Sequence, residues 1–349
     1  MTTIAARPAI GVFLITMACL VSSHPTAHAQ PSLKGKTVTL YVGGGIGGGV
    51  DIFARTFAPH LSRHLPGEPA IIVSNMGGSG GVQGVQYLYN VAAKDGTAVG
   101  TTNSGSISEP LLGRSKVAYE LDKFRWIGSL ARGDTVCGVW HTSAIKSIED
   151  ARQRQVALSA TGVTSGPARA ALLLNALVGT KFKPIPGYPG KAMGLAVERG
   201  ELEGTCVTLS SLRTSQTAWL GDKTFRLLLQ VAIEADPEYP DVPRVADLIK
   251  TPADRQLLDL YLLSYEFNNP YMLPPGTPDD MVAAYRRAFS AAVRDPQYLA
   301  DAAKRRQRVR PRDGADVTGL VQKLLATPDD VVQRMLTVTD PRQQSGAGR

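Results

Sequence analysis

The sequence predicts an α/β fold that contains two α/β units, each with a sheet flanked by helices. Two observations predict it. Short β-branched segments alternate with segments of helical period along most of the chain. Loops rich in glycine, serine and threonine follow several of the short segments, as is typical of parallel α/β sheets. The length of 349 residues, 43% of them hydrophobic, is sufficient for two such units.

The first 29 residues are predicted to be a cleaved secretion signal. Arg7 supplies the positive end, and residues 9–21 form an apolar run that is too short to remain in a bilayer. Ala27-His28-Ala29 matches the small-x-small rule, so cleavage is expected near Ala29. The residues before Cys19 form a poor lipobox, and no twin arginine is present. We therefore expect an exported, soluble protein in the periplasm.

A strand, a glycine loop and a helix organise the rest of the chain. Residues 37–42 are β-branched and aromatic, as in a buried strand. The loop at residues 43–49 reads GGGIGGG, and apolar side chains then recur at helical spacing over residues 53–65. Asp51 is predicted to be the N-cap of this helix, with its carboxylate accepting a free backbone N–H.

The glycine loop is predicted to bind a small anion, because it leads without side chains into a helix N-terminus. Gly43, Gly45 and Gly48 also match the dinucleotide pattern GxGxxG. That pattern requires an acid after the next strand to hold a ribose, and Ser74-Asn75 stand there instead. A P-loop would require a lysine, which the loop lacks. The alternative is a tight turn that only lets the helix pack on the sheet.

The next segments repeat this plan. Residues 69–73 are predicted to form a strand, residues 75–81 a second glycine loop and residues 82–92 a helix. A third strand at residues 98–102 leads into the small polar loop 103–106. Ligands bind at the carboxyl ends of parallel strands, so these loops are expected to meet there. None of them carries an obvious general base or nucleophile.

Residues 130–232 are predicted to form the second α/β unit. Its strand at residues 156–159 leads into the small-residue loop 160–166 and an apolar helix at 167–178 that stops at Gly179. Further helices are predicted after residue 277, with Thr327 capping the last one. The other predicted strands are at 124–130, 135–140, 205–209, 225–231 and 261–267.

Two cysteines remain after removal of the signal, and both lie in predicted strands. In an oxidising compartment, the even pair Cys137 and Cys206 suggests a disulfide if the two strands are neighbours. Two buried free thiols are the alternative.

The chain is basic, with a formal net charge of +8 that falls to +7 without Arg7. A run of basic residues between Lys304 and Arg312 contains no aromatic residue, which argues against nucleic acid as a partner. This run is predicted to be a solvated helix face and loop. A modest positive field also favours anionic ligands.

An enzyme is the main competing hypothesis. His60 and His64 are four residues apart on the first helix, but His60 lies off the apolar stripe and no third metal ligand is evident. Cys137 and His141 could suggest a thiol nucleophile, but Cys137 lies inside an apolar strand. We therefore expect no metal, no cofactor and no catalysis.

The order of the motifs resembles a known family. The export signal is followed by a strand and GGGxxGGxD, then by NxxGxGG, DG, YPDVP and PPGTP. This order resembles the extracytoplasmic solute receptors of the tripartite tricarboxylate transporter system, the TctC or Bug family, over residues 34–335. The resemblance implies the class II periplasmic-binding-protein (Venus flytrap) fold, in which two lobes joined by crossing strands close on a ligand. Family members mostly bind small carboxylates.

The resemblance also implies ligand-binding positions. On the first lobe it places a carboxylate against the glycine loop, with two further residues beside it. The second lobe would contribute a Ser/Thr-rich loop and a tyrosine. The bulky residues that commonly precede the glycines are absent, and Ser210-Ser211 stand where an acid is frequent. The implied ligand residues are Gly43, Gly44, Gly45, Ile46, Gly47, Asn75, Ser104, Thr161, Thr164, Ser165 and Tyr188.

We therefore expect a monomeric periplasmic receptor that captures a small organic anion, namely a carboxylate, and delivers it to a membrane permease. The first lobe is expected to comprise residues 30–129 and 233–349, and the second lobe residues 130–232. Two alternatives remain open. The protein could present its ligand to a membrane signalling partner, or it could be a secreted nucleotide-dependent enzyme.

Overall fold

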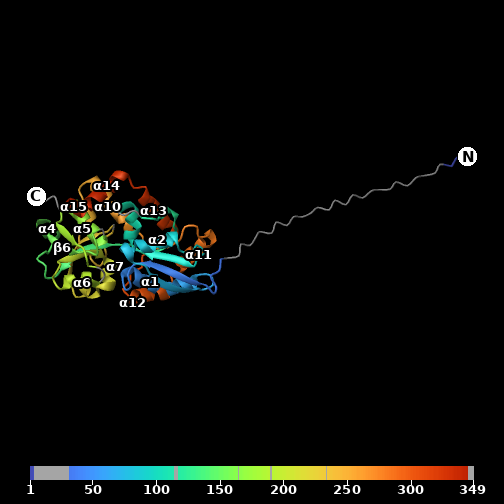
Figure 1. The fold of residues 1–349 in the computed structure, drawn as a ribbon, viewed down its shortest axis with the longest axis horizontal. Helices are drawn as coiled ribbons and strands as arrows, with labels where there is room; N and C mark the ends of the chain where they lie inside the picture. Colours follow the sequence, from blue (N-terminus) through green and yellow to red (C-terminus); the bar gives the residue numbers. More distant parts are fainter. Residues whose placement is uncertain (4–30, 114–116, 164, 189–190, 233, 345–349) are drawn as a thin grey trace. The chain divides into compact units, whose positions relative to one another are not determined.

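The structure is a computed structural model that describes residues 1–3, 31–113, 117–163, 165–188, 191–232 and 234–344 (Figure 1). Residues 4–29 of the predicted signal, and its cleavage site, lie outside the described residues. The chain from Pro31 onward belongs to one unit. Among the described residues, no helix is both long enough and apolar enough to cross a membrane.

The first sheet has the strand order β11-β4-β10-β3-β1-β2. Its strands β1, β2 and β3 are parallel, whereas β10 runs antiparallel to β3 and β4, and β11 runs antiparallel to β4. The strands are β1 (Thr37–Gly43), β2 (Ala70–Asn75), β3 (Ala98–Thr102), β4 (Arg125–Ala131), β10 (Asn268–Leu273) and β11 (Arg312–Asp313).

The second sheet has the order β7-β6-β8-β5-β9. Here β6 is parallel to β7 and β8, and β5 runs antiparallel to β8 and β9. The strands are β5 (Thr135–Trp140), β6 (Val156–Ser159), β7 (Phe182–Ile185), β8 (Gly204–Thr208) and β9 (Phe225–Val231). Two separate mixed sheets with interleaved helices confirm the predicted two-lobe α/β fold.

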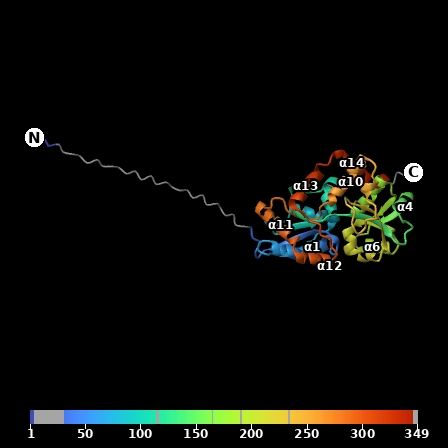
Figure 2. The ribbon, with the colours of Figure 1, turned by 180° about the vertical axis from the view of Figure 1, so that it is seen from behind.

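Helices flank both sheets (Figures 1 and 2). In both views α4 and α6 accompany the second sheet, α1 and α11 accompany the first, and α10, α13 and α14 share one edge. The helices are α1 (Gly49–His64), α2 (Val82–Asn90), α3 (Ser104–Leu112), α4 (Ile148–Gln153), α5 (Gly166–Val178), α6 (Lys191–Glu198), α7 (Leu209–Ser215), α8 (Thr217–Gly221), α9 (Val245–Leu248), α10 (Pro252–Tyr265), α11 (Asp279–Ala292), α12 (Pro296–Lys304), α13 (Gly314–Leu325), α14 (Asp329–Val338) and α15 (Pro341–Gln344).

An aromatic cluster fixes α1, the helix that follows the glycine loop. The Phe57 ring makes edge contacts with Tyr271 of β10, Phe289 of α11 and Tyr298 of α12, at centroid distances of 5.2, 5.2 and 4.9 Å. All four rings are buried. Each such contact stabilises by about 0.5–1.5 kcal/mol beyond the area that it buries. These contacts hold α1, and with it the helix start that follows the glycine loop, firmly against the first sheet.

A cluster of buried apolar side chains joins the two sheets. One continuous cluster of buried side chains includes Ile107 of α3, Leu173 of α5, Leu258 of α10 and Met335 of α14. The same cluster contains Met272 of the first sheet. The lobes therefore share apolar packing on the side where these four helices meet.

The cysteine pair lies inside this shared cluster. Cys137 of β5 is opposite Cys206 of β8 in the ladder, and a disulfide with an S–S distance of 2.00 Å joins them. Of the two alternatives left open by the sequence, the structure therefore contains the bridge. It lies within the second sheet.

Two predicted elements are wrong. The expected strand at 261–267 is instead the end of α10, which stops at Tyr265. Leu258, Tyr261 and Leu262 are buried at helical spacing, so packing decides against the strand preference of the aromatic residues. Thr327 does not cap α14, because the N-cap of this helix is Pro328.

The basic run is not a solvated loop throughout. Arg308, Arg310 and Arg312 occupy every second position after α12, and each reaches an acid on another part of the chain. Arg310 pairs with Glu234 at 3.2 Å, and Arg312 pairs with Glu266. The acids of Arg308 are described below.

Candidate ligand site at the glycine loop

The glycine loop and the two loops predicted to adjoin it do meet. The Asn75 amide donates from Nδ2 to the Gly44 carbonyl oxygen at 3.0 Å. A Cβ on Gly77 would lie 2.9 Å from the Gly44 carbonyl carbon, and one on Gly81 would lie 2.4 Å from the Gly43 oxygen. Only glycine permits this approach of backbone to backbone. The parallel pairing of β1 with β2 and β3 brings the loops together.

Asp51 has a different role from the predicted one. The N-cap of α1 is Gly48, and Asp51 is the third residue of the helix. Its Oδ2 accepts the Gly47 N–H at 2.9 Å, and its Oδ1 accepts from Arg55 Nε and Asn75 Nδ2, each at 2.9 Å. The prediction failed because the helix begins within the glycines, before its first apolar residue.

The Asp51 carboxylate is buried and stays ionised. Burial alone raises its pKa, but the hydrogen bonds from Gly47, Arg55 and Asn75 outweigh burial and lower the pKa below its usual range. The side chain is 2% exposed. Because Arg55 neutralises the carboxylate, the pair braces the loop without adding net charge to it.

Backbone donors remain free at this loop. Within the described part of the chain, the N–H groups of Gly45, Ile46, Gly49 and Val50 have no hydrogen-bond acceptor. A Cβ on Gly45 or on Gly47 would meet no atom within 4 Å, so the space before the loop is open. Gly47 has a φ of +73°, which favours glycine. An open row of donors at a helix N-terminus is an anion-binding arrangement.

The third loop is the start of a helix that the sequence did not reveal. Asn103 is the N-cap of α3 and accepts the Ser106 N–H at 3.1 Å, while its Nδ2 donates to the Gly80 oxygen at 2.8 Å. The predicted ligand residue Ser104 is only 4% exposed, in the first turn of α3. The signal that could have found the helix is the asparagine cap with serines in the first turn.

The predicted residues of the second lobe are placed at the start of α5 and after β7. Thr161 is exposed, and Tyr188 is half-buried and donates its N–H to the Ala160 oxygen. Ser165 is the N-cap of α5, but its Oγ donates to the Gly162 oxygen at 2.7 Å. Thr164 lies outside the described residues.

Helices that follow strands of the two sheets contact each other at two points. A Cβ on Gly49 of α1 would lie 3.6 Å from Ser211 Oγ in the first turn of α7. Arg169, near the start of α5, donates from Nη1 to Ser108 Oγ of α3 at 3.0 Å. The first turn of α7 thus lies against the start of α1, and the first turn of α5 contacts the second turn of α3.

Sequence reasoning missed Arg169 and its partner. The Arg169 side chain is 9% exposed, and its guanidinium is 3.9 Å from the Glu109 carboxylate. Burial raises the pKa of Glu109, although the nearby guanidinium acts to lower it. A single charged residue inside the apolar sequence of α5 is the signal that could have identified this contact.

The two histidines of α1 contact acids at the start of α12 and within it. Contrary to the prediction, His60 is buried, with Nε2 3.2 Å from the Asp301 carboxylate and its ring 5.4 Å from that of Tyr298. His64 Nε2 is 3.2 Å from Asp295. No group of three or more potential metal ligands occurs among the described residues.

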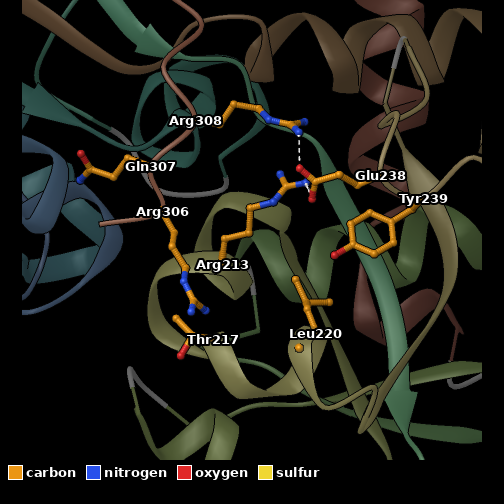
Figure 3. Close-up of a pocket in the computed structure, with 9 residues that line it drawn as sticks. Arg213, Thr217, Leu220, Glu238, Tyr239, Arg306, Gln307 and Arg308 are labelled. Atoms are coloured by element: carbon orange, nitrogen blue, oxygen red, sulfur yellow. Dashed lines mark hydrogen bonds and ion pairs between the residues drawn. The ribbon is translucent and has the colours of Figure 1, made fainter. Parts of the chain in front are cut away.

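One pocket, of about 490 Å³, lies away from the glycine loop. We call it the junction pocket. Arg213, Thr217, Glu238, Tyr239 and Arg306 are among the residues that line it, and none of the predicted ligand residues does (Figure 3).

The comparisons identify similar proteins. The family model described as "Tripartite tricarboxylate transporter family receptor" matches residues 53–336. MatC from Rhodopseudomonas palustris, solved with bound malate, is 21% identical, with a TM-score of 0.65 over 87% of this chain and 98% of that one. Rpa4515 from R. palustris, solved with adipate, is 20% identical, with a TM-score of 0.68 over 86% and 97%.

A third similar structure is a TctC solute-binding protein from Polaromonas without ligand, with 19% identity and a TM-score of 0.62 over 85% of this chain and 98% of that one. At these identities the structures show a shared fold. No protein with a curated function matches the chain.

Proposed function

Because the chain belongs to the tripartite tricarboxylate transporter receptor family, we propose that it captures a small carboxylate at the glycine loop and delivers it to a membrane permease. The family is one of solute receptors, not of enzymes. The observation that supports the proposal best is the open row of free N–H groups at Gly45, Ile46, Gly49 and Val50.

The energetics suit a carboxylate. Each hydrogen bond to a charged group contributes about 1.5–3 kcal/mol, and a helix N-terminus adds about 0.3–2 kcal/mol. Three or four such contributions, less the cost of lobe closure, approach the roughly 8 kcal/mol of a micromolar complex. Since Asp51 is neutralised by Arg55, it does not cancel this attraction. No metal or covalent step is part of the proposal.

The similar structures support the class of ligand. MatC was solved with malate and Rpa4515 with adipate, and both ligands are dicarboxylates. A second carboxylate would extend toward the other lobe, where Thr161, Thr164, Ser165 and Tyr188 are proposed to bind it. In this proposal residues 30–129 and 233–349 form one lobe, and residues 130–232 form the other.

The proposal has three further parts, which concern oligomeric state, processing and cofactors. The mature protein acts as a monomer in the periplasm after cleavage near Ala29, without a cofactor. No observation on the described residues favours the signalling or nucleotide-dependent alternatives.

A thermal-shift screen of the chain from Gln30 onward tests the proposal. Monocarboxylates, dicarboxylates, tricarboxylates, aromatic acids and nucleotides are compared. Binding to the native state alone raises the free energy of unfolding by about 2.7 kcal/mol when the ligand is at a hundredfold excess over Kd. We expect a carboxylate to produce the largest shift.

Gly45→Leu is the matched test of the site. A side chain at Gly45 meets no atom within 4 Å and requires no unusual φ, so this variant keeps the fold but fills the space before the free N–H groups. The control is Gly319→Leu on α13, which is equally unobstructed. The shift should vanish in Gly45→Leu and persist in Gly319→Leu. A shift with nucleotides alone, or an equal shift in both variants, contradicts the proposal.

A further inference from the structure

The junction pocket lies where three parts of the chain meet. Helix α7 contributes Arg213, and α8 contributes Thr217. The segment after β9 contributes Glu238, and the segment after α12 contributes Arg306 and Arg308. Figure 3 shows Arg213 and Arg308 converging on Glu238, and Arg306 directed toward Thr217.

Two arginines of this pocket hold one carboxylate between them. Glu238 Oε2 accepts from Arg213 Nη2 at 2.8 Å, and Glu238 Oε1 accepts from Arg308 Nη2 at 2.8 Å. One oxygen faces each guanidinium. This is the geometry in which a pair of arginines recognises a carboxylate from any source.

A second carboxylate serves the same two arginines but is structural. Asp236 accepts from Arg213 Nη2 at 3.0 Å and from Arg308. Its side chain is 1% exposed, its N–H donates to Gln230 Oε1 at 2.9 Å, and its Oδ1 accepts the Glu238 N–H at 3.0 Å. Asp236 is therefore a fixed counter-charge that keeps the guanidiniums in place.

Glu238 differs from Asp236 because its side chain is 55% exposed. An exposed ion pair gains little net free energy, so the Glu238 carboxylate can leave for water at small cost. Each guanidinium carries five N–H donors, which is enough to serve both the fixed Asp236 and an exchangeable carboxylate. Glu238 is thus the removable occupant of a preformed two-arginine site.

The pocket also carries unbalanced positive charge. Arg306 has no ion-pair partner among the described residues, and three arginines face the two acids. A neighbouring recess shares Arg306 and Thr217 with this pocket and adds Arg305, together with Lys304, which pairs with Asp301 at 3.4 Å. The site is therefore positive even with Glu238 in place, and more so when Glu238 leaves.

We propose that the junction pocket is a second anion site, in which a dicarboxylate group of another molecule replaces Glu238. One carboxylate would bind between Arg213 and Arg308, and the other would bind Arg306 and the Thr217 hydroxyl. A free dicarboxylate and a pair of acidic side chains on a protein partner offer the same chemistry. The site does not depend on what the glycine loop binds.

Helix α7 extends from the junction pocket to the start of α1 beside the glycine loop. Arg213 lies two residues after Ser211, which approaches Gly49 at the start of α1. The short helix α7 thus contacts both regions.

The test removes the built-in competitor. Calorimetric titrations use malonate and a tetraglutamate peptide as probes, in a Gly45→Leu background that keeps the glycine loop out of the readout. As a tethered competitor, Glu238 acts at millimolar effective concentration, so Glu238→Ala should tighten binding of either probe about tenfold. The matched control is Glu201→Ala, which removes an equally exposed acid from another ion pair.

Each outcome decides the proposal. A gain in Glu238→Ala that is absent in Glu201→Ala, and that is lost when Arg306→Gln is added, supports the site. Tighter binding of the peptide then assigns the site to a protein partner, and tighter binding of malonate assigns it to a free solute. Equal gains in Glu238→Ala and Glu201→Ala, or no gain in either, overturn the proposal. A failure of Gly45→Leu to abolish the thermal shift bears on the proposed function alone.

Discussion

The two lobes meet in two regions of opposite character. Where α3, α5, α10 and α14 come together, buried apolar side chains such as Leu173 and Leu258 form one core that continues across both sheets. At the junction pocket, by contrast, Arg213 and Arg308 meet Asp236 and Glu238 beside open solvent. Apolar side chains carry no titratable group and so do not respond to pH, whereas exposed ion pairs respond to pH and are screened by salt.

This contrast assigns different work to the two regions. The apolar region holds the lobes together, because separating it would expose a continuous core to water. The charged region can exchange one partner without unfolding, because Glu238 is 55% exposed while Asp236 stays buried against both arginines. A receptor that must both stay intact and respond to ligands and partners benefits from this division.

Among substitutions in the apolar region, removal of the disulfide in its core should lower the free energy of unfolding most. Replacing Cys137 and Cys206 together by Ala should lower the free energy of unfolding by about 4 kcal/mol in the entropic description of a closed loop, whose ends are 69 residues apart. Urea denaturation under oxidising conditions measures the change. Reduction of the unaltered protein should give the same loss, and a stability insensitive to both would contradict the prediction.

Leu173→Ala is the next largest change. Leu173 is 0% exposed and belongs to the shared core, so truncation should cost about 3 kcal/mol through lost burial and a cavity. The control is Leu299→Ala on α12, where the side chain is 43% exposed and the cost should stay below about 0.5 kcal/mol. Similar unfolding midpoints for the two variants would show that the core is not shared.

The smallest of the three expected effects concerns Asp236 in the charged region and the dependence of stability on pH. Burial alone would raise the pKa of Asp236. The hydrogen bond from the Glu238 N–H and the charges of Arg213 and Arg308 lower it by more, so the folded-state pKa lies below the unfolded value. Its contribution is therefore complete above about pH 4 and disappears as the pH falls toward the folded-state pKa.

Asp236→Asn should accordingly cost about 2 kcal/mol at pH 7. In this variant the decline of stability between about pH 4 and pH 2 should be shallower than in the unaltered protein. Thermal unfolding across this pH range measures both effects. Parallel declines in the two proteins would show that Asp236 is not held as described.

Much of the fold follows from local patterns. The strands at 135–140, 156–159 and 225–231 coincide with their predicted ranges, because each is β-branched or apolar and bounded by turn residues. Helix α10 was mistaken for a strand since Tyr261–Phe267 is rich in aromatic residues, and only packing shows its helical period. Such short apolar runs do not distinguish the two structures.

The candidate site was predictable only in part. The alternation of strand and loop was sufficient to bring Gly43–Gly49 and Asn75 together. The hydrogen bonds that Asp51 accepts from Gly47, Arg55 and Asn75 were not predictable, because they depend on where α1 begins within a run of glycines. The contacts of Arg169 and Arg308 join residues far apart in sequence, and no local pattern encodes such partners.

The position of β10 in the first sheet constrains how the chain assembles. This strand lies between β3 and β4, although it follows them in the chain by more than a hundred residues. The first sheet therefore cannot become continuous before Leu273 is available, and its edge strand β11 arrives later still. Such non-local pairing slows folding. Until β10 arrives, the parallel strands β1, β2 and β3 and the strand β4 therefore remain two unconnected parts of the first sheet.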